Sequence, residues 1–241
     1  MNQRLENEKV SSLLLSLALP SILAQLATLI YNMVDRIYIG RLPDGGLSIA
    51  GLCTSIITII TAFSNLFGRG GAPLASIKLG EKNPKEAERI LGNAFSSLVL
   101  TSIIIMICLL LWGDRILILF GASQKTLPYA LSYLRIYSVG TIFIQLTVGL
   151  NYFINTQGYA KFGMMTLLIG GILNIILDPI FILYLNMGAG GAAIATIIGY
   201  FASDLVFIYL TLKKSKKLSI SLKYTHITKD ELISIFTIGI P

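Results

Sequence analysis

The chain has 241 residues, of which 54% are hydrophobic and only 13% are charged, whereas a soluble globular domain is about 25% charged. This composition excludes an ordinary soluble enzyme and indicates an integral membrane protein. The net charge of +7 does not indicate nucleic-acid binding, because the cationic residues cluster between apolar runs instead of covering one face of a soluble fold.

Six apolar runs are each long enough to cross a bilayer as a helix. They cover residues 13–39, 47–77, 94–112, 128–152, 164–185 and 190–212. Because the runs are continuous and not alternating, helices are favoured over the strands of a barrel. Pro20 and Pro179 lie inside runs and are expected to kink their helices, since proline has no backbone donor. The predicted fold is an all-α polytopic membrane protein with a six-helix transmembrane bundle.

The lysine and arginine residues indicate how the bundle is oriented. Thirteen of the 19 lie at the two ends of the six-span unit or in the connections on that same side, and three lie in the opposite connections. The positive-inside rule therefore places the N-terminus and the 213–230 loop in the cytoplasm of a multi-pass protein of the cell membrane. The remaining three, Arg36, Arg69 and Arg135, fall within spans, and Arg135 is deep enough to need a partner.

The last residues are expected to begin a seventh helix. "SIFTIGIP" at 234–241 resembles "LLLSLALP" at 13–20, as if a second unit began at the same level of the membrane. We therefore divide the chain into an N-terminal lobe at 1–212, a cytoplasmic inter-lobe loop at 213–230 and the start of helix 7 at 231–241. The bundle would be one lobe of a twelve-helix transporter whose C-terminal lobe is missing from this sequence.

Polar residues on the first span form a stripe. Gln25, Thr28, Asn32 and Asp35 fall within an arc of about 80° on a helix that turns 100° per residue, and Tyr31 adjoins it. Such a stripe either lines a cavity or makes hydrogen bonds between packed helices. Asp35 favours a functional role, because a carboxylate in the bilayer costs roughly 2.5 to 3.5 kcal/mol on insertion scales.

The stretch "NIILDPIF" of the fifth span carries a second acid. Asn174 and Asp178 are four residues apart and so share a face, and Pro179 leaves a backbone carbonyl without its donor. At about 1.5 Å per residue, Asp35, Asp178 and Thr196 lie roughly 6, 10 and 9 Å below the outer end of their helices. We predict that these three meet with Asn174 in a site for Na⁺ or for a proton.

Other embedded polar residues leave alternatives open. In the fourth span Gln145, Tyr152 and Asn155 share a face, with Asn151 at its edge, and they either line a cavity or bond to neighbouring helices. Asp204 lies in the cytoplasmic half of the sixth span and either lines the cavity or pairs with a basic residue near the inner surface.

No cofactor and no catalytic site are expected. Cys53 and Cys108 lie in apolar segments without a metal or redox motif, and His226 is the only histidine. The glycine-containing loops lack the GK[ST] ending of a phosphate-binding loop, which disfavours ATP-driven transport by this chain.

Four motifs in order resemble the multidrug and toxic compound extrusion (MATE) transporters. They are "LALPSILAQLATLIYNMVDRIYIGRL", "YLRIYSVG", "NTQGYAKFGMMTLLIGGILNIILDPIFI" and "GAGGAAIATIIGYF". The resemblance implies a V-shaped protein of two six-helix lobes that exports drugs and other amphipathic or cationic organic compounds in exchange for Na⁺ or H⁺. It also implies cation binding by Asp35, Asn174, Asp178 and Thr196, and cavity positions for Tyr31 and Asn151.

Two other functions remain open. A lipid-linked oligosaccharide flippase of the same architecture would be expected to have a more cationic cavity than this sequence indicates, since its embedded charges are largely acidic with Arg135 the main exception. A non-transporting membrane scaffold is the other alternative.

Overall fold

The computed structural model describes residues 10–42, 46–214 and 224–240 of the chain. All regular elements in these residues are helices, which confirms the predicted all-α fold. In chain order they are α2 (Val10–Gly40), α3 (Gly46–Gly80), α4 (Pro84–Leu119), α5 (Leu127–Val139), α6 (Thr141–Thr156), α7 (Ala160–Pro179), the π-helix η1 (Ile180–Tyr184), α8 (Gly188–Lys214) and α9 (Lys229–Gly239).

Four segments of the described residues are long and apolar enough to cross a membrane by themselves. They are Ser48–Gly80, Pro84–Leu119, Ala160–Tyr184 and Gly188–Tyr209. A fifth span results if the bent pair α5 and α6 is counted as one. Helix α2 has 31 residues, a length of about 46 Å that also suffices to cross; its first side chains lie outside the described part, and it is not among the five.

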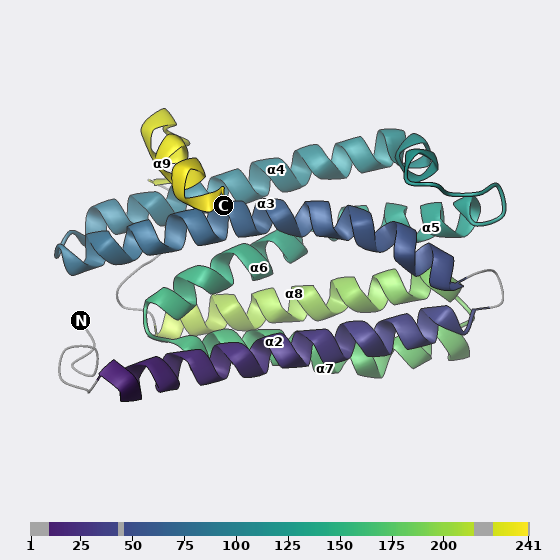
Figure 1. Cartoon of the computed structure of the whole chain (residues 1–241), viewed down its shortest axis with the longest axis horizontal. Coiled ribbons are helices and arrows are strands. Elements are labelled where there is room, and N and C mark those ends of the chain that lie inside the picture. The colour runs from purple at the N-terminus through teal and green to yellow at the C-terminus, as the bar shows by residue number, and fades with distance from the viewer. Residues whose placement is uncertain (1–9, 43–45, 215–223, 241) are drawn as a thin grey trace.

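The long helices run side by side in one bundle (Figure 1). The proximal end of the bundle is the end where α2 begins, with the α3–α4 and α6–α7 turns; the distal end holds the α2–α3, α4–α5 and η1–α8 connections. Helix α7 packs between α2 and α8, whereas α3 packs against α4, α6 and α9. This arrangement brings the first, fifth and sixth predicted spans together.

The fourth predicted span is broken, which sequence reasoning missed. Helix α5 ends at Val139 and α6 begins at Thr141, and the two axes are bent by 57°. Gly140 lies at the break, and a methyl group placed on it would collide with the side chain of Ile197 on α8. Ile197 therefore occupies the inside of the bend, which a continuous helix with a larger residue at 140 would not allow.

Helix α4 extends beyond the apolar run at 94–112 on both sides. It begins at Pro84, where the side chain of Asn83 accepts a hydrogen bond from the backbone of Glu86. Proline at the first position and asparagine at the cap are ordinary helix-start signals. The helix therefore starts at its cap, ten residues before the apolar run begins.

The helix geometry differs at the two prolines that were predicted to kink their helices. Helix α2 continues through Pro20 as one helix. After Pro179 the helix changes from α to π geometry, and the backbone N–H of Leu185 bonds to the carbonyl of Ile180 at 2.9 Å. Because proline removes one donor from the regular pattern, an irregular turn at this position has a physical cause.

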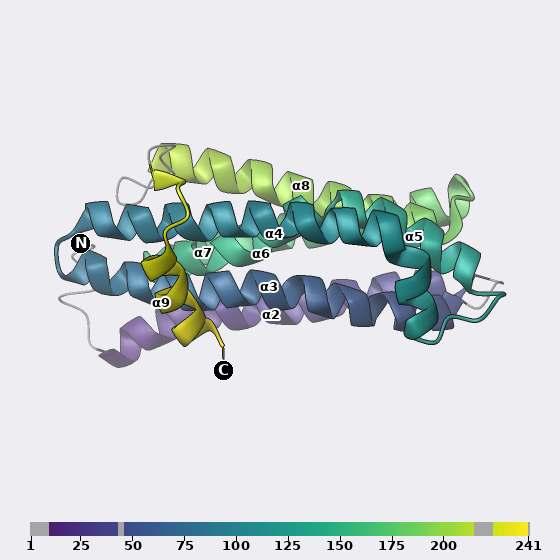
Figure 2. The ribbon, with the colours of Figure 1, turned by 90° about the horizontal axis from the view of Figure 1, so that it is seen from above.

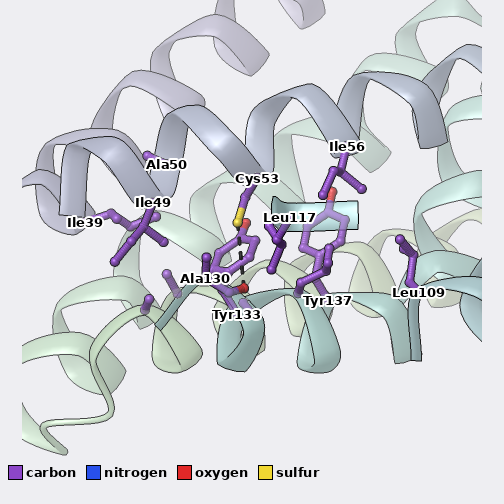
Figure 3. Packing of buried hydrophobic residues seen from close by; sticks show 14 of the residues in the cluster. Ile39, Ile49, Ala50, Cys53, Ile56, Leu109, Leu117, Ala130, Tyr133 and Tyr137 are labelled. Atoms are coloured by element: carbon purple, nitrogen blue, oxygen red, sulfur yellow. Dashed lines mark hydrogen bonds between the residues drawn. The ribbon is translucent and has the colours of Figure 1, made fainter. Parts of the chain in front are cut away.

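Two apolar clusters make the core of the bundle. One joins the distal halves of α3, α4 and α5 with α8, and Figure 3 shows Cys53, Tyr133 and Tyr137 in it. The thiol of Cys53 lies 4.0 Å from the carbonyl of Ala130 and is buried, as expected for a small apolar side chain. The second cluster joins the proximal halves of α3, α4 and α6 and includes Ile235 of α9.

Helix α9, where a seventh helix was expected, lies across α3 and α4 near the proximal end (Figure 2). Arg89 bonds to Glu231 at 2.8 Å, and the fully buried Asn93 accepts a hydrogen bond from the backbone of Thr228 at 2.8 Å. These contacts fix α9 to α4. Of the predicted inter-lobe loop at 213–230, residues 215–223 lie outside the described residues, and α9 already begins at Lys229.

Candidate functional site

A cavity of about 590 Å³ lies between α2 and α3 on one side and α5 to α8 on the other. Its wall includes the stripe of α2 that was predicted from helical spacing, namely Gln25, Thr28, Tyr31, Asn32 and Asp35. Helix α8 contributes Thr196 and Tyr200. The cavity is large enough for a small organic molecule.

Asn174 holds the centre of a hydrogen-bonded group beside this cavity. Its side-chain amide donates to a carboxyl oxygen of Asp178 and to the hydroxyl of Thr196, each at 3.2 Å. Asp178 is completely buried and Asn174 is 3% exposed. Thr196 lines the cavity and Asn174 and Asp178 lie behind it, so the group is reached from the cavity through Thr196.

Three oxygen atoms of this region have no hydrogen-bond partner among the described residues. They are Oδ1 of Asp35, Oδ1 of Asn174 and Oδ2 of Asp178, and all are buried. Asp35 and Asp178 come from α2 and α7, which pack against each other. Unpartnered buried oxygens are costly, and a cation or a proton bound among them would remove that cost.

The ligand chemistry limits which cation fits. Among the described residues there is no cluster of three or more His, Cys, Asp or Glu side chains, so a transition-metal centre has no ligand set here. The site offers two carboxylates, one amide oxygen and one hydroxyl, all of which are hard oxygen donors. This set fits Na⁺ or a proton, and both would be transported substrates rather than resident cofactors.

Four tyrosines line the cavity together with Asp35, and of these sequence reasoning predicted only Tyr31. The hydroxyls of Tyr31 on α2 and Tyr200 on α8 are 3.1 Å apart. Tyr133 and Tyr137 of α5 are stacked with ring centroids 5.5 Å apart, and both line the cavity with Asp35. The spacing of four between Tyr133 and Tyr137 was visible in the sequence, but only the packing of α5 against α8 turns them toward Asp35.

Glycines allow the close contact between α7 and α8 that positions this group. A methyl group on Gly199 would lie 2.7 Å from the carbonyl oxygen of Gly170, and one on Gly170 would lie 2.8 Å from the carbonyl oxygen of Gly199. The two backbones therefore touch directly. Since Asn174 is one turn from Gly170 and Thr196 is near Gly199, this contact sets the distance between them.

The predicted residues of the fourth span have different positions. Asn151, Tyr152 and Asn155 line the cavity, whereas Gln145 does not. Gln145 is fully buried and accepts a hydrogen bond from Thr101 of α4 at 2.9 Å. Of the two roles left open for Gln145, hydrogen bonding between helices is the one that the structure has.

The arginines of the spans also differ from expectation. Arg36 and Arg69 line the cavity, whereas Arg135 is exposed and does not. Arg69 donates to the hydroxyl of Tyr152 at 3.0 Å, and that hydroxyl donates to Asn65 at 2.9 Å. Arg36 and Arg69 are exposed as well, and they add two cationic groups to a cavity wall whose embedded charges were expected to be largely acidic.

Of the two roles predicted for Asp204, cavity lining is wrong, and pairing with a basic residue stays untested because the side chains of the lysines at 213–217 lie outside the described part. It is absent from the cavity wall, and no ion pair joins it to a cation within the part of the chain that the structure describes. Its Oδ1 accepts a hydrogen bond from Thr147 of α6 at 2.7 Å.

These features define a polytopic α-helical membrane protein in which buried carboxyl groups adjoin a polar cavity inside one six-span lobe. Residues 20–180 match the MatE family model, which identifies the family within this class of membrane proteins. The chain belongs to the MatE family, the multidrug and toxic compound extrusion transporters.

Individual relatives agree with this assignment. The multidrug export protein MepA of Staphylococcus haemolyticus (strain JCSC1435) is 33% identical over 238 residues, which are 98% of this chain and 52% of that protein. The crystal structure of MATE in the straight conformation superimposes with a TM-score of 0.88 at 25% identity and covers 98% of this chain and 53% of its own. An outward-facing multidrug resistance MATE family transporter superimposes with a TM-score of 0.85 at 25% identity over 94% of this chain and 51% of its own. The chain spans about half the length of the curated relatives it matches.

Proposed function

We propose that this chain is the cation-coupled lobe of an exporter of amphipathic organic compounds, driven by Na⁺ or H⁺ entering the cell. The observation that carries the proposal is the group of unpartnered buried oxygens on Asp35, Asn174 and Asp178 beside the cavity. Because lipid and protein around them offer no donor, the site gains most when a cation or proton binds. The exported compound binds in the cavity next to it.

Coupling follows if the ion and the compound favour different states of the bundle. Binding of a cation neutralises Asp35 and Asp178 and draws α2 toward α7 and α8, whereas release restores their mutual repulsion. We call Asp35, Asn174, Asp178 and Thr196 the cation group. Thr196 bonds to Asn174 of this group and also lines the cavity. A compound in the cavity therefore competes with the cation through shared contacts, and exchange requires such a difference in affinity between states.

The orientation belongs to the same proposal. The proximal end carries Lys78, Lys82, Lys85 and Arg89, so it faces the cytoplasm by the positive-inside rule. The cation group then lies nearer the outer surface. The lipid bilayer, the exported compound and a C-terminal lobe are the partners that this function requires.

The test is cation binding to the purified chain. Saturable ²²Na⁺ binding is expected to be lost in Asp178→Asn; where the group binds a proton instead, the variant should take up fewer protons on acidification than the wild type. Asp114→Asn is the matched control, because Asp114 is an exposed acid on α4 outside the cavity. Equal binding by Asp178→Asn and the control would refute the assignment. Ethidium efflux from cells that express a full-length relative gives a second test: unchanged efflux after the aspartate that corresponds to Asp178 is replaced by asparagine would also refute it.

A second function has one observation in its favour. Arg36 and Arg69 on the cavity wall are the feature expected of a flippase for lipids with a pyrophosphate group, since guanidinium groups bind phosphate oxygens in pairs. Comparing the affinity of the chain for tetraphenylphosphonium with its affinity for farnesyl pyrophosphate separates the two. Tighter binding of the pyrophosphate, weakened in Arg69→Gln, would favour the flippase.

A further inference from the structure

Helix α8 carries three polar residues in line, and the proposed cation site uses only the first. Thr196, Tyr200 and Asp204 follow at intervals of four residues and so share one face. Thr196 bonds to Asn174, and Tyr200 lies 3.1 Å from the hydroxyl of Tyr31. Asp204 is eight residues beyond Thr196, about 12 Å along the helix toward the proximal end.

The carboxyl group of Asp204 is buried, and only one of its two oxygens has a hydrogen-bond partner among the described residues. The residue is 8% exposed, and Oδ1 accepts a hydrogen bond from Thr147 at 2.7 Å. The same Thr147 hydroxyl lies 3.3 Å from the carbonyl oxygen of Tyr200. Oδ2 is buried without a partner among the described residues, so an ionised Asp204 leaves one charged oxygen unsolvated in a low-dielectric site.

A second polar row on α6 joins Asp204 to the cavity. Thr147, Asn151 and Asn155 again follow at intervals of four residues, and the amide of Asn155 donates to Asn151 at 2.9 Å. Asn151 and Asn155 both line the cavity. The α6 row therefore begins at the cavity wall and ends at the buried Thr147 hydroxyl that bonds to Asp204.

The ionisable groups that face the α8 row come from three neighbouring helices. They are Tyr31 and Asp35 of α2, Tyr133 and Tyr137 of α5, and Asp178 of α7. None of them bonds to Asp204, and α6 presents the neutral Thr147 to it. The described side chain that bonds to Asp204 is therefore an uncharged hydroxyl, and a proton at Oδ2 would neutralise the carboxylate.

We propose that Asp204 is a second proton-binding site of this lobe, separate from the site at Asp35 and Asp178. Binding forms one O–H bond at Oδ2 while a hydronium ion loses its proton and becomes water, and release reverses both changes. A metal cation is a poorer occupant, because one carboxylate, one hydroxyl and one backbone carbonyl supply few ligands. The inference goes beyond the proposed function and stands whether or not Na⁺ binds near Asp178.

Infrared difference spectroscopy of the full 241-residue chain in lipid tests the proposal. As the pH is lowered, a C=O band of a protonated carboxyl group should grow and should shift in D₂O. In Asp204→Asn this titrating band should be lost, whereas Asp178→Asn should keep it. Thr147→Val should keep the titration but move the band to higher wavenumber, because the carboxyl group loses its hydrogen-bond donor.

Two results would overturn the proposal. One is an Asp204→Asn spectrum whose titrating carboxyl bands all equal those of the wild type. The other is that the band that is lost in Asp204→Asn follows the Na⁺ concentration at constant pH. If Asp204→Asn does not fold, the band shift in Thr147→Val decides alone: an unshifted band assigns the signal to another carboxyl group. Loss of ²²Na⁺ binding in Asp178→Asn with the Asp204 band intact separates this proposal from the proposed function.

Discussion

Replacing Gly199 by alanine tests whether the contact between α7 and α8 positions the cation group. The added methyl group would lie 2.7 Å from the carbonyl oxygen of Gly170, whereas non-bonded atoms prefer at least about 3.5 Å. The clash is with backbone, which cannot rotate away as a side chain can. The two helices therefore have to separate by about 0.8 Å at this point.

That separation is enough to break the central hydrogen bond. Asn174 and Thr196 are 3.2 Å apart, so the same movement takes them to about 4.0 Å, beyond hydrogen-bond distance. Overpacking of this kind costs about 1 to 3 kcal/mol of stability. Losing the orientation of a ligand residue lowers cation affinity by about 10- to 100-fold.

The assay combines a melting curve of the purified chain with ²²Na⁺ or proton binding. Gly51→Ala is the control, because a methyl group on Gly51 has no neighbouring atom within 4 Å. Gly199→Ala should melt at a lower temperature than the control and should bind the cation more weakly. If both variants melt and bind alike, the contact between the glycines does not position Asn174, and the reasoning fails.

Two further predictions concern the proximal end. Asn93→Ala leaves the backbone N–H of the half-buried Thr228 without its acceptor, at a cost of about 1 kcal/mol. Trypsin should therefore cleave after Lys229 faster than in the wild type, and equal cleavage rates would mean that Asn93 does not hold α9. With Cys53 and Cys108 replaced by alanine, a single cysteine at position 82 (Lys82→Cys) should react with a membrane-impermeant maleimide from the cytoplasmic side alone, and labelling of intact cells from outside would contradict the proposed orientation.

Much of the cation group was readable from helical geometry. The spacing of four between Asn174 and Asp178 predicted a shared face, and helix rise predicted the common level of Asp178 and Thr196, which Asn174 bridges in the structure. Both predictions require only that the helices are regular and that they run parallel or antiparallel to one another across the membrane. Whether these residues bind a cation stays a prediction.

Other features depend on contacts between distant residues and were not readable. The break at Gly140 exists because Ile197 fills the bend, and the apolar run around it gives no local signal. The inward position of Arg69 depends on Tyr152 from another helix. The sequence was equally compatible with an Arg69 side chain that extends to the membrane surface, because the sequence alone does not show which helices pack against a given helix face.

The contact between α9 and α3 has a mechanical consequence. A methyl group on Gly70 would collide with the backbone of Ile235, and one on Gly239 would collide with the backbone of Leu66. The two helices therefore meet through main chain at two points, and the rings of Phe67 and Phe236 pack edge to face between them with centroids 5.8 Å apart. If α3 tilts when the cavity changes its opening, α9 is expected to move together with α3 as one rigid unit.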